Sequence, residues 1–317
     1  MIRARSLWLR AGGPVIGAGV AVLAAAGLLL LAGASPLEAF RQMGLGAFGS
    51  VNRLADVLVV WGPLVLVTAG LLVTFAAGLW NIGIEGQIVM GAIGVTGVLR
   101  LLQDAPLPPW LVLSIALAAG MTAGAAWAVL AGLLKTIGGV NEIFGGLGLN
   151  FIASALILWL IFGPWKRPGI GSMSGTEPFP ESLGLPTLAG TRLSLWSLAL
   201  GLAAVGAMAL LLSRSALGLR LRAVGLNARA AFLLGVPTWR HLLVAFGLCG
   251  ALAGLAGFVQ VTAVYHRLIP SISSGYGFLG LLVALIIRCR AVWVVPVAAF
   301  YAAITIGGIQ LPIALQL

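Results

Sequence analysis

One polar interruption of the chain decides its fold: Gly78-Leu79-Trp80-Asn81-Ile82-Gly83-Ile84-Glu85-Gly86-Gln87. Apolar residues dominate 54–78 before this stretch and 88–102 after it, whereas its middle holds amides, a carboxylate and glycines. Polar groups at membrane depth are costly unless they face protein or a water-filled cavity, and glycine lets a backbone break or approach a neighbour closely. The stretch therefore predicts a broken or re-entrant segment near 78–87 that lines a permeation route. A short polar turn with Glu85 at the membrane surface is the alternative.

The composition is that of a polytopic membrane protein. Of the 317 residues, 61% are hydrophobic and 8% are charged, and the mean hydropathy is +1.14. A water-soluble domain of this size needs far more surface charge. We therefore predict an all-α transmembrane helical bundle that forms one domain over 1–317. The bundle should have about nine spans, with eight and ten as the neighbouring alternatives.

Apolar runs recur between short polar breaks. The predicted spans are 13–34, 54–78, 88–102, 110–134, 141–162, 193–212, 242–262, 276–287 and 291–311. The first run follows three arginines and lacks a small-residue cleavage site, which indicates an uncleaved span rather than a signal peptide. Residues 35–53 form a more polar link with room for a short interfacial helix.

The net charge of +11 is concentrated in short breaks between the apolar runs. Because basic loops stay in the cytoplasm, we place the N-terminus, the loop at Lys135, residues 214–240 and residues 288–290 inside. The Pro-, Gly- and Ser-rich stretch 163–192 then becomes an external loop. Basic loops of this kind face anionic membrane lipid, and their distribution argues against nucleic-acid binding.

The sequence offers no residues for bond chemistry. It lacks a glycine-rich loop ending in Gly-Lys-Ser or Gly-Lys-Thr, so it has no such site for ATP. His241 and His266 do not form a zinc-binding pair, and Cys249 and Cys289 lie in or beside spans, where they predict neither a disulfide nor a metal site. We therefore predict a protein that is not an enzyme.

Further polar residues occur at the head of the span 141–162. Asn141 and Glu142 are residues typical of a helix start, and capping is one interpretation of them. Asn150 lies deeper, where an unpaired amide is costly, so it should bond another helix or a solute. The candidates for lining or shaping the solute route are Asn81, Glu85, Gln87, Asn141, Glu142 and Asn150.

The basic segment 214–240 contains a short helix by prediction. Asn227 can cap a helix over 228–234, and Gly235 with Pro237 would end it. A capped amphipathic helix between two spans suits a docking surface for another protein. A basic loop that faces lipid is the alternative.

Three motifs in the same order resemble those of the permease subunits of bacterial ABC importers of the ribose and branched-chain amino-acid type. The stretch 81–87 is similar to the family signature, and 140–143 with 150–153 resembles the nucleoside and simple-sugar branch. Residues 222–227, with 230–231 and 235–236, are similar to the loop that couples to the ATPase. The resemblance covers about 54–291, although 145–148 is richer in glycine than expected for the branch. Many relatives continue beyond the position of Leu317, so we expect either nine spans or a shortened C-terminus.

The resemblance implies a transport subunit in the bacterial cell membrane. It implies pairing with a second permease, either the same chain or a paralogue, below an extracytoplasmic substrate-binding lipoprotein and above a cytoplasmic ATPase subunit that uses ATP and Mg²⁺. The chain itself would bind no cofactor. The implied solute is a nucleoside, with purines or simple sugars as alternatives. The implied ATPase-coupling residues are Arg220, Arg222, Ala223, Gly225, Asn227, Ala230, Ala231 and Gly235.

A secondary transporter driven by an ion gradient is the competing hypothesis. Such a protein needs a coupling-ion site and commonly has an internal inverted repeat. We find no convincing repeat in the sequence.

Overall fold

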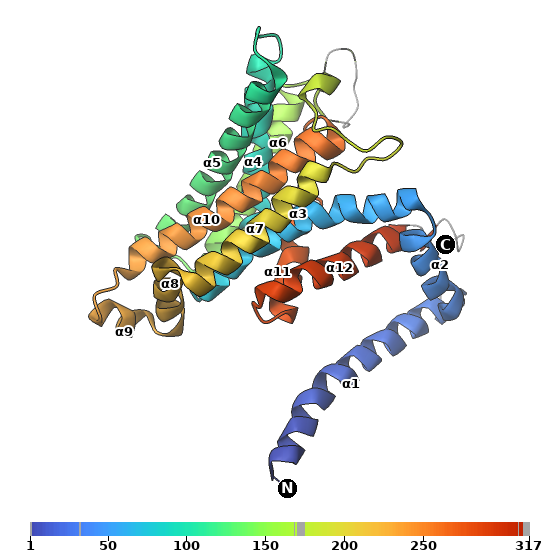
Figure 1. Cartoon of the computed structure of the whole chain (residues 1–317), viewed down its shortest axis with the longest axis vertical. Coiled ribbons are helices and arrows are strands. Elements are labelled where there is room, and N and C mark those ends of the chain that lie inside the picture. Colours follow the sequence, from blue (N-terminus) through green and yellow to red (C-terminus); the bar gives the residue numbers. More distant parts are fainter. Residues whose placement is uncertain (1, 32, 168, 170–174, 310, 313–317) are drawn as a thin grey trace. The chain divides into compact units, whose positions relative to one another are not determined.

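The computed structural model describes residues 2–31, 33–167, 169, 175–309 and 311–312. Within these ranges every regular element is a helix, which confirms the all-α prediction (Figure 1). The α-helices are α1 Ile2–Leu31, α2 Pro36–Phe48, α3 Val51–Ala76, α4 Ile84–Leu102, α5 Pro109–Thr136, α6 Glu142–Phe162, α7 Leu195–Arg214, α8 Ala216–Leu226, α9 Ala228–Leu233, α10 Thr238–Val259, α11 Tyr276–Ile286 and α12 Val294–Ile309. Short 3₁₀ turns lie at η1 Glu181–Leu183 and η3 Ala291–Trp293, and a π-helical stretch, η2 Gln260–Tyr265, follows α10.

The multi-pass helical bundle is also confirmed. Seven of the described helices are long and apolar enough to cross a membrane, or up to eight if the pair Gly19–Leu31 and Pro36–Phe48, bent by 106°, is one span. The predicted short span 276–287 forms α11, which has only 11 residues. At 1.5 Å per residue such a helix is about 16 Å long, roughly half of the hydrocarbon core of a bilayer. The position of Leu317 lies outside the described residues.

The chain divides into two compact units, 1–54 with 303–317, and 55–302. In the first unit, the Arg53 guanidinium donates to the Leu45 carbonyl at 3.1 Å, and Gly307 packs against the backbone of Met43. The second unit contains all the candidate site residues.

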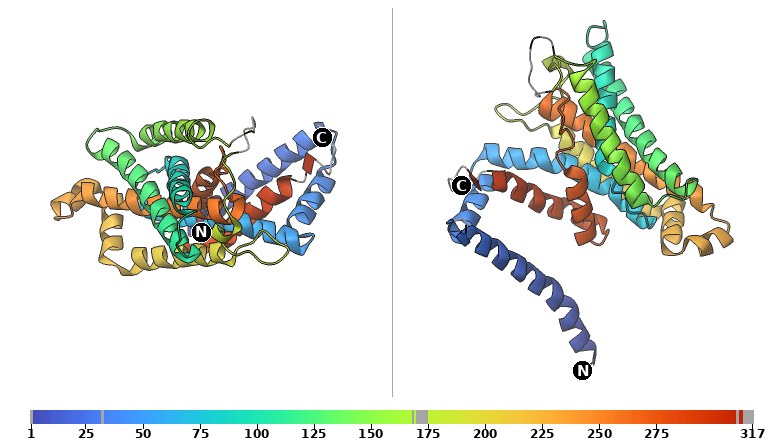
Figure 2. Two further views of the ribbon diagram at one scale, coloured as in Figure 1. Left: turned by 90° about the horizontal axis from the view of Figure 1, so that it is seen from above. Right: turned by 180° about the vertical axis from the view of Figure 1, so that it is seen from behind.

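Close helix packing forms the centre of the second unit. Helix α10 packs extensively against α5 and α4, and α4 also packs against α5; Figures 1 and 2 show α10 alongside this pair. A Cβ on Gly254 would overlap the Gly120 carbonyl, and a Cβ on Gly124 would stand 2.9 Å from the Gly254 Cα. Helices approach so closely only through small residues. The glycines at 120, 124 and 254 therefore lie at contacts between α5 and α10.

The predicted external loop 163–192 lies partly outside the described residues, at 168 and 170–174. Its described part contains one ordered turn, η1. The Thr176 N–H donates to the Leu268 carbonyl and the Leu185 N–H donates to the Thr262 carbonyl, both at 2.9 Å. These bonds fasten the loop along residues 262–268, next to the π-helical stretch.

Candidate functional site

The polar stretch separates helix α3 from helix α4, and the break is where the sequence predicts it. Helix α3 ends at Ala76 and α4 begins at Ile84. The Leu79 N–H donates back to the Thr74 carbonyl at 2.9 Å, which closes the end of α3. Gly78 has a φ of +73°, a left-handed conformation that glycine adopts without a steric penalty. Residues 77–83 are called the break below.

Two amides pair across the break. The Asn81 Nδ2 donates to the Gln87 Oε1 at 3.0 Å, and the Gln87 Nε2 donates to the Asn81 Oδ1 at 2.9 Å. Both side chains are buried, and the Asn81 Nδ2 also lies 3.2 Å from the Cys249 Sγ on α10. Buried polar groups cost little when they are paired in this way. The pair therefore fixes the geometry of the break in this conformation.

Asn150 of α6 satisfies backbone groups that the break leaves free. Its Oδ1 accepts from the Gly86 N–H at 2.8 Å, and its Nδ2 donates to the Ile82 carbonyl at 2.9 Å. The first N–H groups of a helix have no partner inside that helix, so a side chain from elsewhere must supply one. From the sequence, the partner of Asn150 could be another helix or a solute. In the structure its partners are backbone groups of the break and of the start of α4.

The glycines of α6 explain how Asn150 reaches the break. A Cβ on Gly146 would stand 2.7 Å from the Gly83 nitrogen. Side chains at either position would push α6 away from the break. The glycine-rich run 145–148 thus contains a position where close packing requires glycine.

Glu85 connects the start of α4 to the start of α11. Its Oε1 accepts from the Phe278 N–H at 3.1 Å, and the Gly277 N–H and the Ser273 hydroxyl lie close enough to act on the carboxylate. A helix N-terminus attracts an anion because its free N–H groups and its dipole both point toward the negative charge. Glu85 is 7% exposed, so it lies inside the protein and not at its surface. Its depth in the membrane, at the surface or further in, stays a prediction.

Asn141 and Glu142 both act at the start of α6. The Asn141 Oδ1 accepts from the Ile143 N–H at 2.8 Å, which confirms the capping interpretation. Glu142 pairs with Lys135 at the end of α5, with 2.6 Å between the Nζ and the Oε2, and its carboxylate lies near the Trp80 N–H. Glu142 thus contacts the break as well.

Helices α8 and α9 lie together beside the start of α10 (Figure 1). The Asn227 Oδ1 accepts from the Ala230 N–H at 2.9 Å, which confirms the predicted cap of α9. The helix ends at Leu233, and Gly235 has a left-handed φ of +83°.

The α8–α9 pair exposes a row of large apolar side chains. Leu226, Leu233 and Leu234 are 89%, 78% and 84% exposed, respectively. Among the predicted coupling residues, Ala231 is buried and Ala223 is half-buried. The others, all exposed, are Arg220, Arg222, Gly225, Asn227, Ala230 and Gly235.

Gly225 makes a contact that the sequence did not reveal. Its backbone lies against the end of α3 and the start of the break: a Cβ on Gly225 would overlap the Ala76 carbonyl and stand 2.9 Å from the Gly78 nitrogen. In the sequence, only the presence of a glycine in each of the two motifs hints at this contact. Glycines are too common in this chain for such a pair to predict a contact.

Comparison with known proteins gives a consistent result. Residues 53–316 match the family described as the branched-chain amino acid transport system permease component. The chain is similar to the glucose ABC transporter permease protein TsgB13 of Haloferax volcanii, with 32% identity over 97% of this chain and 82% of that protein. It is also similar to the guanosine ABC transporter permease protein NupP of Bacillus subtilis, with 29% identity over 95% of this chain and 86% of the relative. The nucleoside ABC transporter permease protein NupB of Lactococcus lactis is 26% identical over 86% of this chain and 77% of its own length.

Proposed function

We propose that a nucleoside is the solute of this chain, which belongs to the branched-chain amino acid transport permease family. As a member of that family it is a membrane subunit of an ABC importer and not an enzyme. Two of the relatives above are named for guanosine and nucleosides. The glucose permease supports a second candidate, a simple sugar. Both solute classes are neutral and rich in hydrogen-bond donors and acceptors, which suits a route shaped by amides.

The convergence of polar side chains on the break carries the proposal for the route. The amides of Asn81 and Gln87 bond to each other, and Asn150 and Glu142 reach backbone N–H groups within residues 80–86. Glu85, just after the break, bonds to the start of α11. Asn141 caps the helix that brings Glu142 and Asn150 there. In the proposal these six residues shape the route by holding the break, and they need not all touch the solute.

Partners are proposed from the exposed face of α8 and α9. We place the N-terminus and residues 214–240 in the cytoplasm and residues 163–192 outside, in agreement with the positive-inside rule. The exposed leucines of α8 and α9 then form the docking surface for the ATPase subunit, which uses ATP and Mg²⁺. A second permease and an extracytoplasmic substrate-binding lipoprotein complete the importer in the cell membrane.

Gly225 gives this arrangement a route for coupling. A displacement of α8 by the ATPase reaches Ala76 and Gly78 directly, because no side chain separates the two backbones. From the break, Glu85 passes the displacement to α11. Nucleotide binding shifts the equilibrium between outward-open and inward-open states only as far as the partners bind those states with different affinity.

Competition for uptake tests the solute assignment. Cells that express the complete importer would take up labelled guanosine in the presence of unlabelled adenosine, free purine, ribose, glucose or leucine. We expect adenosine to compete and leucine to have no effect. Uptake of labelled glucose without uptake of guanosine would establish the second candidate, and uptake of leucine alone would contradict both.

A further inference from the structure

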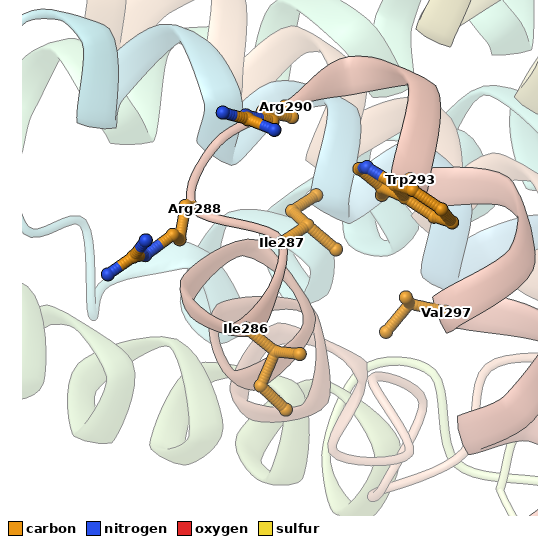
Figure 3. A pocket seen from close by; sticks show the side chains of 6 residues that line it. All are labelled: Ile286, Ile287, Arg288, Arg290, Trp293 and Val297. Atoms are coloured by element: carbon orange, nitrogen blue, oxygen red, sulfur yellow. The ribbon is translucent and has the colours of Figure 1, made fainter. Parts of the chain in front are cut away.

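In the described part of the chain, the two arginines of the turn between α11 and α12 have no ion-pair partner. Arg288 and Arg290 flank a cavity of about 250 Å³ whose other lining residues are Ile286, Ile287, Trp293 and Val297 (Figure 3). Among the described residues the only ion pairs join Arg41 to Glu38 and Lys135 to Glu142. Arg288 and Arg290 are both exposed, and no carboxylate of the described residues pairs with them. They are therefore available to an external anion.

The backbone of this turn favours glycine but contains arginine. Arg288 and Cys289 have φ values of 50° and 57°, in the left-handed region. The Arg288 N–H donates to the Leu285 carbonyl and the Cys289 N–H donates to the Ala284 carbonyl, both at 3.1 Å, a pattern that ends many helices with glycine. A side chain at such a position is strained. What Arg288 contributes therefore comes from its guanidinium group, which projects out from the turn in Figure 3.

The rim of the cavity is apolar. Ile286 and Trp293, which line the cavity, are 58% and 52% exposed, respectively. Tryptophan is enriched where the headgroup region meets the hydrocarbon core, and basic pockets beside membrane helices suit lipid headgroups. A partner's carboxylate would pair with the arginines but would not explain the exposed apolar rim. A phospholipid accounts for both features, with its phosphate at the arginines and its acyl chains along Ile286 and Trp293.

We propose that this cavity binds the phosphate of an anionic phospholipid headgroup. Arg288 and Arg290 donate to the phosphate oxygens, which match the planar, multiply donating guanidinium group. Ile286 and Trp293 contact the glycerol and the upper acyl chains. The site does not depend on which solute the importer carries.

Native mass spectrometry of the full-length protein, purified together with its ATPase, tests the site. Wild-type protein would be released from micelles that contain equal amounts of phosphatidylglycerol and phosphatidylcholine. We expect it to retain phosphatidylglycerol selectively, and we expect the Arg288→Gly and Arg290→Ala variants to lose this selectivity. Arg288→Gly also relieves the left-handed strain, so a loss of lipid in this variant cannot be explained by unfolding.

Arg240→Ala is the matched control. Arg240 is exposed and lies over the Trp239 ring, 5.1 Å from its centroid, but it does not line the cavity. This variant should retain phosphatidylglycerol as the wild type does. Wild-type retention by both cavity variants would overturn the proposal. So would displacement of the lipid by an equal concentration of inorganic phosphate, which would indicate a site for free phosphate. Unchanged retention with loss of the ATPase from the purified complex would instead make the turn a protein contact.

Discussion

The backbones of Gly78 and Gly225 lie in contact: a Cβ on Gly78 would stand 3.1 Å from the Gly225 Cα. Gly78 is the second residue of the break that interrupts the membrane helices, and Gly225 lies near the end of α8, a helix that we place in the cytoplasm. The contact joins the segment proposed to meet the ATPase to the segment proposed to shape the solute route.

Asn150→Leu should destabilise the protein strongly. The substitution leaves the Gly86 N–H and the Ile82 carbonyl without their partner, and each buried unsatisfied group costs about 1–3 kcal/mol. We expect a lower midpoint of thermal unfolding in detergent and little uptake. Asn141→Ala, which removes an exposed helix cap, should cost only about 1 kcal/mol. Equal stability of the two variants would show that Asn150 does not hold the break.

The Asn81 and Gln87 amides should behave as one unit. Asn81→Leu or Gln87→Leu alone leaves a buried amide unpaired, whereas the double variant removes both partners. The double variant should therefore lose less stability than the sum of the single variants, by about 0.5–3 kcal/mol. A double-mutant cycle of unfolding free energies measures this difference. Strict additivity would mean that the two side chains do not interact.

Gly277→Ala should disturb the contact between Glu85 and α11. The added Cβ would stand 2.9 Å from the Glu85 Cγ and 2.8 Å from the Ile84 Cγ2, so the carboxylate must move from the helix N-terminus. Overpacking of this kind costs about 1–3 kcal/mol, and we expect reduced uptake at equal expression. Gly148→Ala in α6 is the control, because no atom lies within 4 Å of its added Cβ. Full uptake by Gly277→Ala would contradict a role in transport for the contact between Glu85 and α11.

Leu234→Asp should release the ATPase without unfolding the permease. Leu234 is 84% exposed, and substitutions at such positions usually change stability by less than about 0.5 kcal/mol. A charge in an apolar docking surface opposes burial against a partner. Co-purification of the ATPase measures the effect, and Arg229→Ala should be milder because an exposed charge contributes about 0–1 kcal/mol. Wild-type recovery of the ATPase with Leu234→Asp would place the docking surface elsewhere.

Ala231 is unsuitable for that test. Ala231 is only 3% exposed, although it lies in a helix whose other side chains are exposed. A carboxylate there would disrupt the packing of α9 within the permease itself. Gly225→Glu is unsuitable as well, because Gly225 packs against backbone atoms of residues 76–78.

Local features of the fold could be predicted from the sequence, since they depend on neighbouring residues. Hydropathy located the long helices, and residue type identified the caps Asn141 and Asn227. The polar stretch marked the break, because polar residues between long apolar runs are unusual. Each of these features is decided within one or two helical turns.

The partners of the polar side chains could not be predicted in the same way. Glu85 meets Phe278 and Asn150 meets Ile82, and these pairs depend on how distant helices pack. The contact between Gly78 and Gly225 leaves even less trace, because glycine has no side chain whose chemistry could identify a partner.

Gly225→Ala tests the proposed coupling most directly. The added Cβ would overlap the Ala76 carbonyl, whereas the Cβ of the control Gly206→Ala in α7 would meet nothing within 4 Å. Both variants would be purified with their ATPase, reconstituted into proteoliposomes and assayed for solute uptake and ATP hydrolysis together. The account predicts that Gly225→Ala assembles and hydrolyses ATP but transports far less solute per ATP, while Gly206→Ala matches the wild type. Equal solute transported per ATP by all three proteins would contradict coupling through Gly225 and the break.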